Sequence, residues 1–288
     1  MRYAVNLPIL GEFSNPRALV DLAREAEAAN WDAVFVWDSL LFDNKMMPPI
    51  ADPWIALAGI AASTSRIKIG TMIAQLARRR PWKVAREVVT LDHLSAGRMI
   101  LGVGLGFSAA AEFEQFGEEG DARVRANKLD ECLDVLVGLC SGEPFSYSGE
   151  YYHVKETIFL PCPIQQPRVP IWVAGYWPNK RPFRRAARWD GVCPAEVEAH
   201  NDGSLTILQT SPQTARTIAA YVDEHRTSNA PFDMIISRAL PHDDPEQTAA
   251  LVAAYAEAGV TWLLRDMMPW EVSLAQAYKI IRRGPPSV

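Results

Sequence analysis

The chain has few histidines and cysteines, and their spacing excludes the usual metal and disulfide arrangements. It contains five histidines and four cysteines in 288 residues. No two histidines form an HxH pair, and no two cysteines have CxxC spacing. A catalytic metal needs clustered histidine and carboxylate ligands, so we expect no metal site, and a metal-dependent hydrolase is not supported. We expect the cysteines to be buried free thiols of a protein in the reducing cytoplasm.

Long apolar runs and an excess of positive charge are also missing. No apolar run reaches the roughly 20 residues of a membrane helix, and the first ten residues lack the pattern of a signal peptide. The net charge of −5 gives no electrostatic reason to bind nucleic acid or an anionic membrane. We therefore expect no membrane span and no nucleic-acid partner. Acyl transfer is unsupported too, because no GxSxG nucleophile motif occurs.

The chain does contain a regular alternation of apolar strand patterns and amphipathic helix patterns. Its 49% hydrophobic and 22% charged residues are typical of a globular protein, and no linker divides it. Eight strand-helix units follow one another, and several helices are predicted to start at a proline. Parallel strands need helical crossovers, and eight units can close a sheet. We therefore predict one (β/α)8 TIM barrel domain over residues 1–288.

One segment interrupts the alternation after the fourth unit. Residues 142–168 contain alternating aromatic residues around Ser148-Gly149, which is typical of a β-hairpin. We interpret this segment as an insertion into the barrel.

The carboxyl ends of the predicted strands are where a barrel of this type places its active site. The segment 66–107 carries two such ends and finishes in a run of glycines. Position alone nominates the following residues: Asn6, Asp38, Thr71 to Gln75, Gly104 to Phe107, Ala174 to Trp177, Ala195, Glu196, Arg238, Arg265 and Asp266.

The glycines after the fourth strand have three interpretations. Gly104 to Ala109 matches a loose GxGxxA dinucleotide pattern, but the polar connection that follows does not fit a Rossmann unit. The glycines either serve the backbone alone or let a flat ring lie against the strand end. The second of these is the preferred interpretation.

Charged side chains near the strand ends are the candidates for chemistry. Asp38 follows an apolar strand and acts either as a general base or hydrogen-bond acceptor, or as a cap of the next loop. Ser39 and Phe42 are expected to line the same cavity. Residues 175–180 suit a phosphate group, or else form an exposed basic helix face. Arg78-Arg79-Arg80 has two interpretations, an anion-binding site or the lining of a solvated loop, and we favour the second.

Several segments together resemble the bacterial-luciferase-like family of flavin-dependent oxidoreductases. The matching pieces are LAREAEAANWDAVFVWDSL (22–40), ADPWIALAGIAASTSRIKIGTMI (51–73), RRRPWKVAREVVTLDHLSAGRMILGVGLG (78–106), GEPFSYSGEYYHV (142–154) and PIQQPRVPIWVAG (163–175). Their order and spacing make the resemblance more specific than any single motif.

The resemblance implies a barrel that binds FMN or the deazaflavin coenzyme F-420 at the strand ends, usually in a homodimer. The ring is expected against a bulge after the third strand, with a non-proline cis peptide at Met72-Ile73. By the same correspondence, the expected cofactor-binding residues are Asp38, Thr71, Met72, Ile73, Gly104, Gly106, Ala174, Gly175, Tyr176 and Trp177.

Two positions depart from the family. Many members have histidine after the second strand, whereas this chain has Asp38-Ser39, so the usual proton donor is absent. We expect Asp38 and Ser39 to be the catalytic residues, near the reactive edge of the ring. Phe107 stands where some deazaflavin dehydrogenases have glutamate, which argues against a sugar-phosphate dehydrogenase.

The predicted function is therefore a flavin-dependent oxidoreductase of a small organic substrate. FMN is slightly preferred and implies a monooxygenase supplied by a flavin reductase, whereas F-420 implies hydride transfer. Glu196 and Arg265 are the candidates for substrate contact, and residues 43–50 and 196–210 would set specificity. The missing histidines motivate an alternative of another class, a non-catalytic flavin-binding protein.

Overall fold

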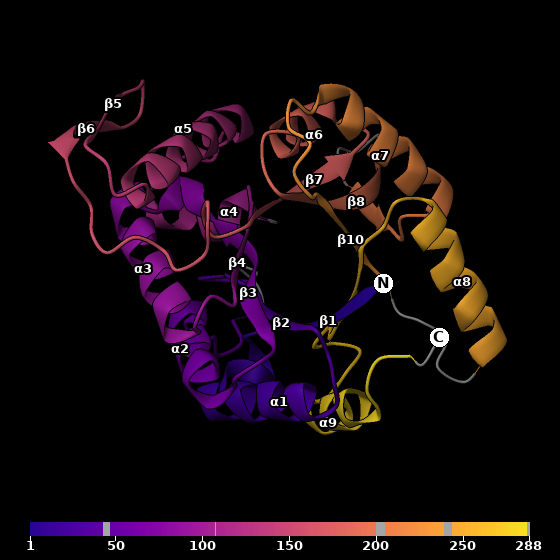
Figure 1. Cartoon of the computed structure of the whole chain (residues 1–288). Helices are drawn as coiled ribbons and strands as arrows, with labels where there is room; N and C mark the ends of the chain where they lie inside the picture. Colours follow the sequence, from indigo (N-terminus) through magenta and orange to yellow (C-terminus); the bar gives the residue numbers. More distant parts are fainter. Residues whose placement is uncertain (43–46, 107, 200–204, 239–243, 287–288) are drawn as a thin grey trace.

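Eight parallel strands form a closed barrel in the described part of the chain, and helices surround it (Figure 1). The computed structural model describes every residue except 43–46, 107, 200–204, 239–243 and 287–288. The barrel strands are β1 (Arg2–Leu7), β2 (Ala33–Val36), β3 (Lys68–Gln75), β4 (Met99–Gly104), β7 (Ile171–Trp177), β8 (Gly191–Ala199), β10 (Asp233–Ser237) and β11 (Trp262–Asp266). They lie in the order β10-β11-β1-β2-β3-β4-β7-β8, and β10 also pairs with β8, which closes the sheet. The predicted (β/α)8 barrel is confirmed.

The helices that connect the strands start where their local sequence signals place them. They are α1 (Pro16–Ala28), α2 (Pro53–Ser63), α3 (Pro81–Leu94), α5 (Ala122–Cys140), α6 (Lys180–Ala186), α7 (Pro212–His225), α8 (Pro245–Glu257) and α9 (Leu274–Arg283). Five of them begin at a proline, and in four of these the side chain before the proline accepts a first-turn backbone N–H; these caps are Asn15, Asp52, Ser211 and Asp244. Shorter turns are α4 (Ala109–Glu112), η1 (Gly11–Ser14), η2 (Leu76–Arg78) and η3 (Glu114–Phe116).

Two apolar layers lie on either side of the barrel wall. Inside it, Trp172 packs against Phe35 and Trp262, with both pairs of ring centroids 5.3 Å apart. Outside it, alternate strand residues such as Val34 and Leu263 belong to the larger core shared with the helices. This alternation decides which side chains near a strand's carboxyl end face the barrel interior.

The sixth barrel strand is longer than the sequence predicted. We expected only residues 191–193, but β8 continues to Ala199 because its second half pairs antiparallel with β9 (Leu205–Leu208). Glu196 lies opposite Leu208 in this ladder. The sequence from 196 to 210, expected to be loop, therefore contains a strand beside the mouth of the barrel.

The segment after α5 forms a hairpin outside the ring of helices (Figure 1). Its strands are β5 (Phe145–Ser148) and β6 (His153–Thr157), which pair antiparallel in a sheet of their own. Glu131 of α5 holds the connecting turn by accepting hydrogen bonds from three successive backbone N–H groups, those of residues 150–152. The hairpin is thus attached to the barrel through α5. Among the described residues, no helix has the length and hydrophobicity to cross a membrane.

Candidate functional site

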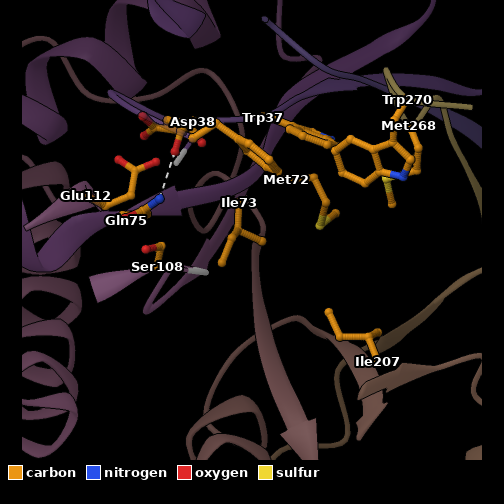
Figure 2. A pocket seen from close by; sticks show the side chains of 12 residues that line it. Trp37, Asp38, Met72, Ile73, Gln75, Ser108, Glu112, Ile207, Met268 and Trp270 are labelled. Atoms are coloured by element: carbon orange, nitrogen blue, oxygen red, sulfur yellow. Dashed lines mark hydrogen bonds between the residues drawn. The ribbon is translucent and has the colours of Figure 1, made fainter. Parts of the chain in front are cut away.

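A cavity of about 270 Å³ lies at the carboxyl ends of the barrel strands (Figure 2). Figure 2 shows its polar side chains gathered on one side, and they are Asp38, Gln75, Ser108 and Glu112. The labelled apolar side chains occupy the remainder of the wall: Trp37, Met72, Ile73, Ile207, Met268 and Trp270. Ser39 and Phe42 also line the cavity. Six residues that the sequence nominated for the site therefore meet in one place, namely Asp38, Ser39, Phe42, Met72, Ile73 and Gln75.

The floor of the cavity is made where β3 departs from regular pairing with β4. The ladder is regular up to Thr71 opposite Leu101 and resumes with Ala74 opposite Val103. The two residues between, Met72 and Ile73, line the cavity, and the peptide bond that joins them is cis, as the sequence predicted. A bulge at the end of a barrel strand re-aims side chains toward the site. Here it turns two consecutive apolar side chains toward one cavity.

Thr71 and two glycines, Gly104 and Gly106, pack against this bulge. The buried Thr71 hydroxyl donates to the Gly102 carbonyl at 2.9 Å, which ties β3 to β4. A Cβ on Gly104 would lie 2.1 Å from Ile73 Cδ1, and a Cβ on Gly106, where φ is +85°, would lie 2.3 Å from Gln75 Oε1. The missing side chains thus make room for side chains of β3 itself. Direct contact of these three residues with a cofactor stays a prediction.

A buried network of charges forms the polar side of the cavity. Arg78 Nη2 donates to Asp38 Oδ1 at 2.7 Å, and Arg79 Nη2 donates to both oxygens of Asp38, at 2.9 and 3.0 Å. Arg78 Nη1 also pairs with Glu112 and donates to Gln75 Oε1 at 3.1 Å. Two carboxylates and two guanidinium groups thus balance one another in a region almost closed to water.

This network changes the interpretation of two sequence predictions. Arg78 was expected in a solvated loop, which is wrong, because its side chain is only 3% exposed and pairs with two carboxylates. Asp38 was weighed as a general base, but both of its oxygens already accept hydrogen bonds from guanidinium groups. A carboxylate held in this way stabilises the cavity wall, and a cation already engages each of its oxygens.

An aromatic cluster forms the opposite rim. The Trp37 and Phe42 rings stack with centroids 6.3 Å apart, and Trp270 lies 5.5 Å from Phe42 and 6.3 Å from Trp37. Trp270 is 59% exposed, so much of its ring faces solvent at the cavity entrance. Large aromatic surfaces of this kind bind flat apolar molecules.

Comparison with known protein families places the chain in one family. The model of the luciferase-like monooxygenase family matches residues 4–203, which is more than half of the chain. The chain belongs to this family. The matched region runs from within β1 to beyond the end of β8 and contains most of the cavity wall, but not Ile207, Met268 or Trp270.

Individual relatives of this luciferase-like chain share a third or less of the aligned residues with it, as three examples show. An uncharacterized protein of Mycobacterium tuberculosis is 32% identical over 174 residues, which cover 60% of this chain and 59% of the relative. The oxygenase component of flavin-dependent trigonelline monooxygenase from Acinetobacter baylyi is 27% identical over 165 residues, covering 57% and 44%. Among solved structures, an F420-dependent secondary alcohol dehydrogenase superposes with a TM-score of 0.76 at 17% identity, covering 99% of this chain and 98% of that one. At this identity the structural likeness concerns the fold.

The end of β7, expected to hold a cofactor phosphate in this luciferase-like chain, lies apart from the cavity wall. None of its four predicted residues, Ala174 to Trp177, is among the side chains that line the cavity. The Trp177 ring packs edge-on against Phe183, with centroids 5.1 Å apart, and Lys180 Nζ lies 3.2 Å from its centroid. A Cβ on Gly175 would lie 2.3 Å from Pro182 Cβ. These residues pack against α6 and its surroundings, and phosphate binding by them stays a prediction.

The basic residues of α6 are partly neutralised by α5. Arg185 pairs with Asp130 and is only 3% exposed, and Arg181 reaches the same carboxylate at 3.4 Å. Neither of the two sequence interpretations, a phosphate site or a wholly solvated basic face, anticipated this pairing. It joins two helices through contacts that span 51 and 55 positions of the sequence.

The two residues proposed for substrate contact are not among those that line the cavity. The Glu196 backbone N–H donates to Thr210 Oγ1 at 3.2 Å, and its side chain is half-buried beside β9. Arg265 follows the inward-facing Leu264, so the alternation of β11 turns Arg265 toward the helices and its neighbour Asp266 toward the interior. The inner position at this strand end thus belongs to Asp266.

Sequence reasoning missed several residues of the wall. Glu112 was assigned to a polar connection, and nothing local predicted that it would reach Arg78 across 34 positions. Ile207 comes from β9, whose short apolar run was the only signal for a strand. Met268 and Trp270 follow the last barrel strand by a few residues, so the strand-end rule could have found them. Phe107, which departs from the family pattern, lies outside the described residues.

Proposed function

We propose that this protein is an oxidoreductase that binds a reduced flavin in the cavity at the barrel mouth. FMN is the preferred cofactor, and F-420 is the alternative. One observation carries the proposal: in a chain of this family, the break in β3 places Met72 and Ile73 side by side on the floor of a cavity at the strand ends.

The residues present fit a ring system of this kind. An isoalloxazine or deazaflavin ring has two flat apolar faces and one polar edge, and the cavity has apolar walls with its polar side chains at one side. Met72, Ile73 and Trp37 would contact the ring faces and exclude water from them. The Ser39 and Ser108 hydroxyls line the cavity and would hydrogen-bond its polar edge or the substrate, whereas the Gln75 amide already bonds Arg78 and the Asp38 carbonyl. The bound cofactor would supply the redox chemistry, as hydride transfer or oxygen activation.

The choice between the two cofactors rests on what each relative is named for. The Acinetobacter relative is a flavin-dependent oxygenase, whereas the F420-dependent dehydrogenase shares the fold at lower identity. We therefore propose monooxygenation of a small organic substrate, with the reduced FMN delivered by a separate flavin reductase. A homodimer, a cytoplasmic location and substrate contacts from Glu196 and Arg265 remain predictions.

Titration with FMN and with F-420 tests the proposal. Trp37 and Trp270 line the cavity, so a ring that binds there is expected to quench tryptophan fluorescence. The matched control replaces Trp82, which is 41% exposed on α3 and does not line the cavity. We expect Trp37→Phe to reduce the quenching amplitude and Trp82→Phe to leave the fractional quenching almost unchanged. Failure of both cofactors to bind would contradict the proposal.

A second candidate is a flavin-binding protein without catalysis. It is favoured by the absence of a histidine after β2, where this chain has Asp38-Ser39, and by the two arginines that hold Asp38. Under this alternative, the protein would bind reduced cofactor tightly and would not accelerate its oxidation with any of a broad panel of ketones, aldehydes and aromatic compounds. Saturable turnover with one compound would rule this candidate out.

A further inference from the structure

Three polar side chains converge inside the barrel, one each from β1, β10 and β11. Asn6, Ser237 and Asp266 lie two positions beyond the interior residues Ala4, Ile235 and Leu264, at the carboxyl ends of their strands. Asn6 Nδ2 donates to Asp266 Oδ1 at 2.6 Å, and the Ser237 hydroxyl donates to Asp266 Oδ2. Asp266 is thus fixed at the centre of a small polar cluster in an otherwise apolar barrel.

The cluster contains an unused hydrogen-bonding group. Asn6 is 4% exposed, and its buried Oδ1 has no hydrogen-bond partner among the described residues. A buried acceptor without a donor is uncommon in folded proteins and points to a group that arrives from outside, such as the hydroxyl or N–H of a ligand. Asp266 and Ser237 retain some solvent exposure at the carboxyl ends of their strands.

The cluster lies next to the cavity, although none of its three side chains is among those that line it. Met72 packs in the interior core with Leu264 and also lines the cavity floor. Asp266 is two residues before Met268, another cavity residue, and the intervening Met267 N–H donates to the Asn6 carbonyl at 3.0 Å. A molecule that extends past Met72 and Met268 into the barrel would reach the cluster.

The surroundings of Asp266 favour its protonated form. Burial is the largest influence and raises the pKa of the carboxyl, and the negative charge of Glu271 acts in the same direction. The hydrogen bonds from Ser237 and Asn6 and the positive charge of Arg265 oppose this, but the pKa remains above its ordinary value. The thiol of Cys193 on β8 faces the same region, and burial raises its pKa to about 12, so it remains neutral.

We propose that Asp266 is the proton donor of this site, oriented by Asn6 and Ser237, and that it supplies the function of the histidine missing after the second strand. The inference rests on the proposed oxidoreductase function. The substrate class is a molecule with a carbonyl or other oxygen atom that gains negative charge when the reduced cofactor acts on it.

The proton transfer is balanced within the cluster. The bond between the proton and an Asp266 oxygen breaks, a bond between that proton and the substrate oxygen forms, and Asp266 is left as a carboxylate. The Asn6 amide and the Ser237 hydroxyl already donate to both carboxylate oxygens and stabilise this charge. Water at the barrel mouth returns the proton, and the reduced cofactor supplies the electrons.

Infrared difference spectroscopy tests the protonation state without any cofactor. Asp266→Asn keeps the size of the side chain and removes its titration, whereas Glu271→Gln removes a nearby charge at an exposed position. We expect wild type and Glu271→Gln to show the carbonyl stretch of a protonated carboxyl at a pH where an ordinary aspartate is ionised, and Asp266→Asn to lack it. The same spectrum in all three proteins would overturn the proposal.

The pH profile of turnover distinguishes a proton donor from a merely structural residue. We expect wild-type activity to fall as pH rises through the pKa of Asp266, and Asp266→Asn to lose about a hundredfold in kcat and this limb of the profile. Ser237→Ala removes a donor to the ionised form and should move the limb to higher pH. An unchanged profile in both variants would refute the proton-donor role.

Cofactor titration of Asp266→Asn separates this inference from the function on which it rests. Binding of FMN or F-420 with wild-type affinity and without turnover supports Asp266 as the donor. If neither cofactor binds to the wild type, the oxidoreductase proposal fails, and the infrared result still reports on Asp266 by itself.

Discussion

Arg78 Nη2 lies 2.7 Å from Asp38 Oδ1, and the two side chains are 3% and 1% exposed. The pair joins the end of β2 to the turn after β3, and Glu112 extends it to the helix after β4. Three consecutive strand ends of the barrel are therefore held together by one guanidinium group. The cavity wall owes its shape to this charge network as much as to apolar packing.

Removal of Asp38 should destabilise the protein strongly. Asp38→Ala leaves Arg79 without its carboxylate and Arg78 with Glu112 alone, and breaking a buried pair by removing one partner costs about 3–5 kcal/mol. We expect the free energy of unfolding in urea to fall by about this amount. Lys83→Ala is the control, because its pair with Glu87 is exposed and should contribute less than about 1 kcal/mol. Equal effects of the two substitutions would show that the buried network is not structurally important.

Two glycines of β4 should respond differently to alanine. A Cβ on Gly102 would lie 2.2 Å from the Thr71 carbonyl oxygen, a backbone atom that cannot move without disturbing the β3–β4 ladder. We expect Gly102→Ala to cost about 3 kcal/mol or more. In Gly104→Ala the clash is with the end of the Ile73 side chain, which can rotate into the cavity. This variant should stay folded and bind its cofactor about tenfold more weakly, a difference of about 1.4 kcal/mol.

Chemical denaturation and cofactor titration of both variants measure this contrast. Unchanged cofactor affinity in a folded Gly104→Ala protein would contradict the placement of the ring against Ile73.

Trp270 should influence ligand affinity more than stability. Its ring is 59% exposed and meets Phe42 and Trp37 at the cavity rim, so Trp270→Ala removes binding surface at little cost to the core. An aromatic contact contributes about 0.5–1.5 kcal/mol beyond burial, so we expect the KM or Kd of an apolar ligand to rise about three- to tenfold. Trp82→Ala on α3 is the matched control and should leave both values unchanged. A Trp270→Ala protein with unaltered KM and Kd would place ligand binding elsewhere.

Asp266 should make stability depend on pH. Its pKa is raised in the folded protein above the ordinary value of 3.8. At a pH between these two pKa values, Asp266 is more often protonated in the folded state than in the unfolded state. The contribution of Asp266 to stability is therefore fully present below pH 3.8 and falls as the pH rises toward the pKa of the folded protein. Asp266→Asn should abolish this decline and leave other carboxylates unaffected. Thermal or urea unfolding of both proteins from pH 4 to 8 provides the measurement, and parallel curves would contradict the raised pKa.

Local signals in the sequence determined the barrel and the location of its site. Caps such as Asp52 before Pro53 act within one helical turn, and apolar alternation acts within one strand, so both can be recognised without knowing the fold. The rule that active sites lie at strand carboxyl ends then placed Asp38, Met72 and Ile73 in one region, and the structure brings them into one cavity.

Tertiary structure decided which side chains meet at that site and what state they are in. Arg78 became a buried partner of Asp38 and Glu112 through contacts spanning 40 and 34 positions, and Ile207 reached the cavity only because β9 pairs with β8. The inward direction of Asp266, and not of Arg265, followed from the register of β11 in the closed barrel. Such contacts depend on which distant segments the folded chain brings together, and burial in that arrangement sets the charge and hydrogen bonding of each group, which no local pattern encodes.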